Sequence, residues 1–199
     1  RSREVVLVPG QVEDDASIRL GAGEIRTNLE LLRKTRALHP EACLIYKPHP
    51  DVEAGLREGK IAHDALDGLA DIVADHADPV ALIARADRVV TMTSLLGFEA
   101  LIRGVPVTCL GAPFYAGWGL TDDLGPIPAR RAARPSLTAL AHAVLIAYPR
   151  YFDPVTGMAC PPEVALERLA SDTIPRPGVR LRALAKLQGW FAGHAHLWR

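Results

Sequence analysis

Three acidic side chains in a row, Glu13, Asp14 and Asp15, follow an apolar run that ends at Pro9 and Gly10. Carboxylates directly after a buried strand can serve glycosyl transfer as a nucleophile, a general base or a stabiliser of an oxocarbenium ion. The alternative, slightly favoured by spacing alone, is a solvated acidic loop that caps the next helix. The segment is therefore a candidate catalytic loop.

A cation and an imidazole lie close together in the segment KPHP. Lys47 and His49 are two residues apart, so both side chains leave an extended strand on the same face. Together they suit a phosphate or a carboxylate, and His49 could donate a proton to a leaving group near neutral pH. A structural histidine is the alternative, and the sequence supports both readings equally.

Thr93 and Ser94 stand where a short apolar strand gives way to a helix. The first amide groups of a helix have no partner within it, so they can bind an anion together with the helix dipole. The alternative is plain capping by the hydroxyl groups. One turn further on, Glu99 could bind ribose hydroxyls, or it could pair with Arg103 four residues later.

A loop rich in glycine and aromatic residues spans residues 111–123 and contains Phe114, Tyr115 and Trp118. Aromatic faces can stack on nucleobases or sugar rings, and glycine lets the backbone approach a ligand closely. For any single ring, packing within the protein is an equally good explanation.

Strands alternate with helices along most of the chain. The patterns predict strands at 4–10, 42–50, 70–75, 88–92 and 105–111, and helices at 24–39, 78–87, 94–104 and 135–148. This alternation indicates an α/β fold, with a parallel sheet covered by helices on both faces. Ligands of such sheets bind beyond the carboxyl ends of the strands, and each polar cluster follows a predicted strand.

Composition excludes several classes of protein. Of 199 residues, 49% are hydrophobic, and 23 basic residues balance 23 acidic ones, so no net charge attracts nucleic acid. No apolar run reaches the roughly 18 residues of a membrane span. Three widely spaced cysteines indicate buried thiols in a cytoplasmic protein, and the carboxylates are not spaced as a metal-ligand set.

The chain is expected to contain one domain at 1–155 and a Pro/Gly-rich segment at 156–199. Its end, 176–199, has five Lys or Arg residues, no acidic residue and several aromatic ones. As an amphipathic segment it could contact anionic lipid at the inner face of the cytoplasmic membrane. Packing against another part of the protein is the favoured alternative.

Four segments, GQVEDDAS, YKPHPDV, TMTSLLGFEALIRGVPV and GAPFYAGWGLT, together resemble the KpsC-type capsule polysaccharide biosynthesis proteins. Those proteins are retaining β-Kdo transferases that use CMP-Kdo to build a Kdo linker on a phospholipid. The resemblance implies a Rossmann-like sheet, similar to the nucleotide-binding half of a GT-B glycosyltransferase. It also implies a missing N-terminal half, a lipid-linked Kdo acceptor, and a CMP-sugar donor with no cofactor.

The resemblance assigns roles to the acidic loop and to KPHP. The family pattern Gln-x-Glu-x-Asp falls on Gln11, Glu13 and Asp15. It implies that Asp15 is the nucleophile of a double displacement and that Glu13 assists it, although Asp14 is close enough to leave this assignment open. The His-Pro motif falls on His49 and Pro50 and implies contact with the CMP phosphate or protonation of the leaving group.

The resemblance also assigns roles around the predicted helix start. Thr93 and Ser94, with Lys47, are expected to bind the CMP phosphate, and Glu99 the ribose, while Tyr115 and Trp118 grip the donor sugar or base. Two other functions fit the same residues. One is a module that binds a nucleotide sugar without chemistry, and the other is an epimerase or hydrolase of similar fold.

Overall fold

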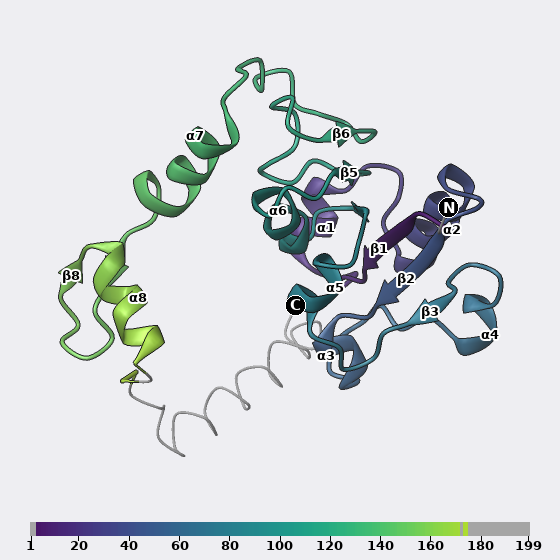
Figure 1. Ribbon diagram of the computed structural model, residues 1–199, viewed down its shortest axis with the longest axis horizontal. Coiled ribbons are helices and arrows are strands. Elements are labelled where there is room, and N and C mark those ends of the chain that lie inside the picture. Colours follow the sequence, from purple (N-terminus) through teal and green to yellow (C-terminus); the bar gives the residue numbers. More distant parts are fainter. Residues whose placement is uncertain (1–2, 172, 175–199) are drawn as a thin grey trace, which may run out of the picture. The chain divides into compact units, whose positions relative to one another are not determined.

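The computed structural model describes residues 3–171 and 173–174. The chain divides into two units, Arg1–His142 and Ala143–Arg199, so the expected boundary after residue 155 falls inside the second unit. Figure 1 labels the elements of both units. The predicted amphipathic segment 176–199 lies outside the described residues, and its two readings stay predictions.

The first unit is built on one parallel sheet with the strand order β3-β2-β1-β4-β5-β6. Its elements are β1 (Val5–Pro9), α1 (Ala16–Gly21), α2 (Asn28–Leu38), β2 (Cys43–Lys47), α3 (Pro50–Glu53), α4 (His63–Leu66), β3 (Ile72–Val73), α5 (Pro79–Ile83), β4 (Arg88–Thr91), α6 (Leu95–Ile102), β5 (Val107–Cys109), β6 (Asp122–Asp123) and α7 (Leu137–His142). The predicted α/β fold is confirmed. This strand order is that of a Rossmann sheet, which reverses its winding direction between β1 and β4.

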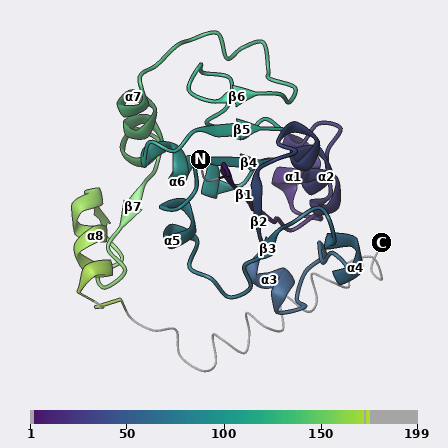
Figure 2. The same ribbon diagram turned by 45° about the vertical axis from the view of Figure 1, so that its right-hand side comes forward.

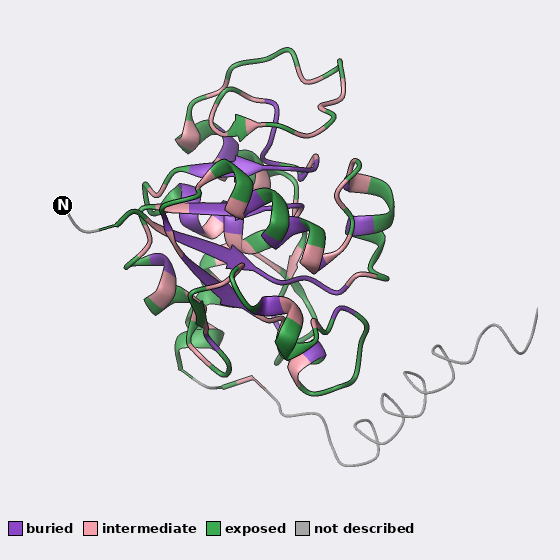
Figure 3. Cartoon of the chain, turned by 90° about the vertical axis from the view of Figure 1, so that its right-hand side faces the viewer, coloured by how far each residue is buried: buried purple, intermediate pink, exposed green. Residues whose placement is uncertain are grey.

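Alternate residues of the strands are buried on opposite faces of the sheet. Val6 and Val8 of β1 pack in one cluster with Ile18 of α1 and Leu31 of α2. Leu7 is also fully buried and points to the other face. Figure 2 shows α1 and α2 on one side of the sheet and α5 and α6 on the other, and Figure 3 shows the buried strands between them.

Local signals determine where the helices begin. Thr27 and Glu30 form a capping box, so the helix expected at 24–39 begins at Asn28 instead. Asp78 caps α5 by accepting from two amides of its first turn. The strand expected at 42–50 ends at Lys47, because His49 accepts from the Asp51 amide and caps the short helix α3.

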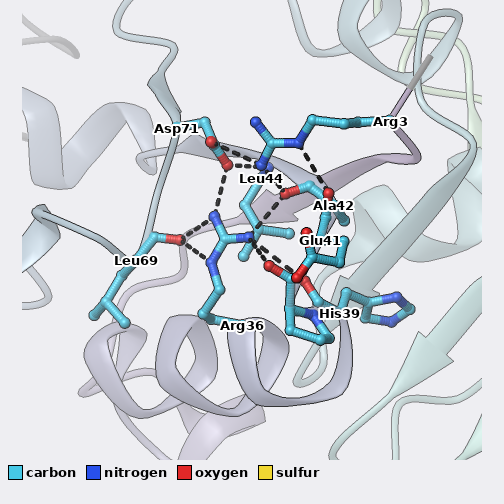
Figure 4. A network of polar contacts seen from close by, with 9 residues as sticks. Arg3, Arg36, His39, Glu41, Ala42, Leu44, Leu69 and Asp71 are labelled. Atoms are coloured by element: carbon cyan, nitrogen blue, oxygen red, sulfur yellow. Dashed lines mark hydrogen bonds and ion pairs between the residues drawn. The ribbon is translucent and has the colours of Figure 1, made fainter.

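An ion-pair network joins residues at the amino-terminal ends of strands β1, β2 and β3 (Figure 4). Asp71 pairs with Arg3 at 3.0 Å and Arg36 at 2.6 Å, and accepts from the Leu44 amide at 2.9 Å. Burial would raise the pKa of Asp71, but these hydrogen bonds outweigh it and lower the pKa to about 2. The resulting stabilisation is complete above the ordinary pKa of 3.8 and is lost as the pH falls through about 2.

The second unit, described by itself, begins with a π-helical turn, Ala143–Ala147, in the segment expected to be α-helical. A two-stranded antiparallel ribbon follows, β7 (Tyr151–Phe152) with β8 (Ala159–Cys160), and then α8 (Pro162–Ala170). Asp153 accepts from Arg168 at 3.0 and 3.1 Å, which ties the ribbon to α8. The ribbon and α8 had no counterpart among the predicted elements.

Candidate active site

A hollow of about 810 Å³ opens at the carboxyl ends of β1, β2 and β4. It therefore lies at the point where the strand order reverses, which is where ligands bind in sheets of this kind. Eight of the residues predicted from the sequence line it: Gln11, Asp15, Lys47, His49, Pro50, Thr93, Ser94 and Glu99. The residues that line it do not include Glu13, Tyr115 or Trp118.

Asp15 offers an ionised carboxylate to this hollow. It caps α1 by accepting from the Ser17 amide at 2.8 Å. Hydrogen bonds from the side chain and backbone of Ser17, helped by the nearby charges of Arg57 and His49, hold the pKa of Asp15 below its ordinary 3.8. Asp14 does not line the hollow, and its Oδ1 accepts from Arg57 Nε at 3.2 Å and Nη2 at 2.9 Å. Of the two carboxylates, Asp15 therefore faces the hollow, and Asp14 is engaged by Arg57.

Glu13 contacts the protein and not the hollow. Its Oε1 accepts from the Asn28 amide at 2.7 Å, at the first residue of α2. A carboxylate in this place stabilises the start of the helix. The position supports a role in holding the acidic loop against α2, and the predicted catalytic assistance by Glu13 stays a prediction.

Gln11 joins the loop after β1 to the loop after β4. Its Nε2 donates to Thr93 Oγ1 at 2.8 Å, and its Oε1 accepts from the Thr93 amide at 2.9 Å and from Thr91 Oγ1 at 3.2 Å. Its main-chain N–H and C=O bond the side chain of Asn28, which is fully buried. Although Gln11 lines the hollow, these contacts occupy both ends of its side-chain amide.

Lys47 is held beneath the hollow by a buried partner. Its Nζ donates to Glu53 Oε1 at 3.0 Å and to the Pro48 carbonyl at 2.8 Å, and both charged side chains are less than a tenth exposed. Burial would raise the pKa of Glu53, but hydrogen bonds from Lys47 and from the His76 amide outweigh it and lower the pKa. An ammonium group has three N–H donors, so one remains for a ligand.

His49 is oriented by the helix that it caps. Its Nδ1 accepts from the Asp51 amide at 3.2 Å, and its side chain is 38% exposed at the edge of the hollow. When Nδ1 of a neutral imidazole accepts a hydrogen bond, Nε2 carries the proton. His49 can therefore donate from Nε2 to a group bound in the hollow, while Pro50 begins α3 behind it.

Helix α6 presents its N-terminus to the same hollow. Ser94 is its N-cap and accepts from the Leu96 amide at 3.2 Å. The positive end of the helix dipole and the amides of the first turn make this a favourable place for a phosphate. Glu99 also lines the hollow, and its Oε2 lies 3.9 Å from Nη1 of Arg103, so the pairing expected as an alternative is present as a loose contact.

The aromatic loop braces α6 from behind. Tyr115 is fully buried, and its hydroxyl donates to the Ser94 carbonyl at 2.5 Å. The ring packs against Phe98 and Phe114. Because the ring is enclosed by protein, the prediction that Tyr115 contacts the donor must be corrected to a supporting role. Trp118 Nε1 donates to the Phe114 carbonyl at 2.7 Å. Trp118 is not among the residues that line the hollow, and its predicted contact with the donor stays a prediction.

Sequence reasoning missed four residues that shape the hollow: Asn28, Glu53, Arg57 and His76. Asn28 and Glu53 act through partners that only the fold brings near. Arg57 and His76 lie in loops after α3 and β3 and had no spacing signal. A second hollow of about 520 Å³ adjoins the first and shares Pro48, Glu53 and His76 with it.

Two absences apply to residues 3–171 and 173–174. This part of the chain contains no cluster of three or more His, Cys, Asp or Glu residues that could hold a metal ion. Its helices are all too short or too polar to cross a membrane.

Comparison with known families identifies relatives of the chain. The model of the family described as "Capsule polysaccharide biosynthesis protein" matches residues 1–151. The capsule polysaccharide modification protein LipA of Neisseria meningitidis serogroup A is 53% identical over 167 residues, which are 84% of this chain and 24% of LipA. The lipopolysaccharide-processing protein LpsZ of Rhizobium meliloti is 47% identical over 176 residues, 87% of this chain and 40% of LpsZ.

Two solved structures are similar in fold and sequence. One is Thermosulfurimonas dismutans KpsC, beta Kdo 2,7 transferase, with a TM-score of 0.77 and 42% identity over 87% of this chain and 55% of that chain. The other is the beta Kdo 2,4 transferase of the same organism's KpsC, with a TM-score of 0.73 and 36% identity over 84% of this chain and 52% of that chain. The chain thus spans about a quarter of LipA and about half of the solved KpsC chains.

Proposed function

We propose a function from the premise that the chain belongs to the family of capsule polysaccharide biosynthesis proteins. It acts in capsule synthesis as the part of a Kdo transferase that binds the donor and carries the nucleophile. The donor is CMP-Kdo, and the acceptor is a lipid-linked Kdo. The two solved relatives, both named as beta Kdo transferases, support this reaction class.

The mechanism begins with the phosphate of CMP-Kdo. In our proposal the phosphate binds at the start of α6, near Ser94 and Thr93, where amide donors and the helix dipole favour an anion. Lys47 supplies its remaining N–H, and the neutral His49 donates a hydrogen bond from Nε2–H to the phosphate as it leaves. All of these groups thus donate hydrogen bonds to the same phosphate, which is the leaving group.

The sugar is transferred in two displacements. The carboxylate of Asp15 attacks the anomeric carbon of Kdo, the bond from that carbon to the phosphate oxygen breaks, and CMP departs. A hydroxyl of the acceptor then attacks the same carbon from the vacated side and releases its proton to solvent, while the bond to Asp15 breaks and the carboxylate is restored. Two inversions give net retention. The ribose of CMP is assigned to Glu99, which lines the same hollow.

One observation carries the proposal. Asp15, His49 and Ser94 come from the ends of three different strands and line a single hollow. A nucleophile, a hydrogen-bond donor to the leaving group and an anion-binding helix start are the groups that this transfer from a nucleotide sugar uses, with no metal in the scheme.

The test uses the full-length protein with CMP-Kdo and compares Asp15→Asn with Asp14→Asn. Asparagine can still cap α1, so the first change removes the carboxylate and keeps the fold. We expect Asp15→Asn to lower the transfer rate by about 10³-fold or more, the scale seen when a nucleophile is removed. Intact-mass spectrometry with donor alone should show one added Kdo residue in wild type and in Asp14→Asn, but not in Asp15→Asn.

Different failures would have different meanings. Near-normal transfer by Asp15→Asn would remove the nucleophile assignment. Binding of CMP without any transfer would favour the non-catalytic module, and activity that needs no CMP-sugar would favour a hydrolase or epimerase. Location at the inner face of the membrane and lipid contact through 176–199 belong to the proposal, on the ground that the acceptor is lipid-linked.

A further inference from the structure

Among the described residues that line the hollow, one permanently charged cation is partly open to solvent. Lys47 is enclosed and paired with Glu53, while Arg57 lines the same hollow with 40% of its side chain exposed. His49 and His76 also line it, but imidazoles carry a full charge only below neutral pH. Arg57 is therefore the group best placed to meet an anion other than the phosphate at α6.

The guanidinium of Arg57 is fixed along one edge and open along the other. Asp14 Oδ1 accepts from Nε and Nη2, which form one of the two forks of the group. Among the described residues nothing accepts from Nη1, so the fork made by Nη1 and the second Nη2 hydrogen faces no protein partner. A planar fork of this kind matches the two oxygens of a carboxylate.

The donor sugar supplies such a carboxylate beside the nucleophile. Kdo is a ketosugar acid, and its anomeric carbon bears a carboxylate directly. When Asp15 attacks that carbon, two negative groups must approach within a few ångströms, which is unfavourable unless a cation lies between or beside them. Arg57 and Asp15 line the same hollow, and Asp14, the anchor of Arg57, is the residue next to Asp15.

We infer that Arg57, held in place by Asp14, binds the carboxylate on the anomeric carbon of the donor sugar and so selects ketosugar-acid donors. This inference rests on the proposed function. It also gives Asp14 a task, because an anchored arginine loses less rotamer freedom when it binds than a free one. The alternative is that Arg57 and Asp14 form an ordinary surface ion pair, which contributes little to stability and binds no ligand.

The test exploits the fact that CMP lacks the sugar carboxylate. In the full-length protein, the KM for CMP-Kdo, the KM for the acceptor and the inhibition constant of CMP are measured for wild type, Arg57→Gln and Arg57→Lys. Arg33→Gln, an exposed arginine of α2, is the matched control. We expect Arg57→Gln to raise the KM for CMP-Kdo about ten- to hundredfold, the scale of a hydrogen bond to a charged group. The inhibition constant of CMP should change less than about twofold.

The variants separate charge from geometry. Arg57→Lys should recover part of the donor affinity, because it keeps the charge and loses the fork, and Asp14→Asn should give an intermediate KM. Equal weakening of CMP and CMP-Kdo, no change in either, or an effect on the acceptor alone would overturn the assignment. If wild type itself transfers no Kdo from CMP-Kdo, the proposed function fails and takes this inference with it. If wild type transfers normally and Arg57→Gln behaves like wild type, only the role of Arg57 is lost.

Discussion

At the scale of single residues, the site depends as much on side chains that bond protein as on those that face the hollow. Gln11 has every polar group engaged, and its partner Thr93 is 82 residues away in the sequence. It keeps the acidic loop in register with the start of α6. Gln11 thus links the loop that carries Asp15 to the loop that carries Ser94.

Replacing Gln11 by methionine tests this role, because methionine has a similar length and no amide. The Thr93 amide and the Thr91 hydroxyl would lose their partner, so we expect the free energy of unfolding to fall by about 1–3 kcal/mol. We also expect kcat to fall, because the acidic loop and the start of α6 lose the contact that links them. Denaturant unfolding and steady-state kinetics measure the two effects.

Lys34→Met, on the exposed side of α2, is the control and should change stability by less than about 0.5 kcal/mol. A Gln11→Met protein with normal stability and a normal kcat would show that the amide is dispensable.

The sequence predicted which residues would lie near the hollow, but not which protein groups they would contact. Asp15, His49 and Ser94 could be found because polar residues at strand ends converge in a parallel sheet. The tasks of Gln11 and Arg57 could not, because their partners are set by contacts between loops. Residue type and spacing carry no information on such contacts.

At the scale of elements, the loop after β5 determines how firmly α6 presents its N-terminus. The Tyr115 hydroxyl lies against Gly97 in the first turn of α6, where an added Cβ would come within 2.1 Å of it. Burial raises the pKa of Tyr115 well above its ordinary value, so the hydroxyl stays protonated and remains a donor. Gly97 is thus needed because only a residue without a Cβ leaves room for the Tyr115 hydroxyl. Its backbone does not adopt the left-handed conformation that favours glycine elsewhere.

A double-mutant cycle on Gly97→Ala and Tyr115→Phe tests this contact. We expect Gly97→Ala alone to destabilise the protein by about 1–3 kcal/mol through overpacking, and Tyr115→Phe alone by about 1 kcal/mol through the lost hydrogen bond. The two losses should not add, because phenylalanine removes the atom that the new methyl group meets first. Thermal or urea unfolding of the four proteins gives the coupling.

Strict additivity would contradict this account of the packing. A second readout is CMP affinity, which should fall in Gly97→Ala because the start of α6 is displaced. An unchanged CMP affinity would place the phosphate elsewhere than at this helix.

The lengths of the strands and the start of α3 could not be predicted from the hydrophobic pattern of the sequence. The strands were predicted because short apolar runs are bounded by Pro, Gly and Asp, but Ile72–Val73 and Val107–Cys109 are shorter than their apolar runs. The helix α3 was missed because KPHP was taken as a strand end, whereas His49 caps a turn that Pro50 starts. Such boundaries depend on single hydrogen bonds that hydrophobic periodicity does not report.

At the scale of the whole molecule, strand order creates the site. The alternation of strands and helices predicted a parallel sheet, but not that β1 lies between β2 and β4. That placement brings three strand ends around one hollow, and among the residues that the structure describes, all that line it belong to the unit Arg1–His142. The proposed donor-binding groups are thus confined to one unit.

This confinement predicts that residues 1–142 bind CMP as well as residues 1–199 do. The cut falls after α7, so Leu140, which is buried, stays in the fragment. A ligand that binds only the folded state raises its melting temperature, by an amount that depends on ligand concentration and affinity. We therefore expect equal affinities from calorimetry and equal shifts of the melting temperature with CMP, after each protein has shown a cooperative melt without ligand. If the shorter chain melts cooperatively but binds CMP much more weakly, residues beyond His142 must contribute to the donor site. That result would contradict a donor site formed by the first unit alone, and with it the proposed dependence of the site on strand order.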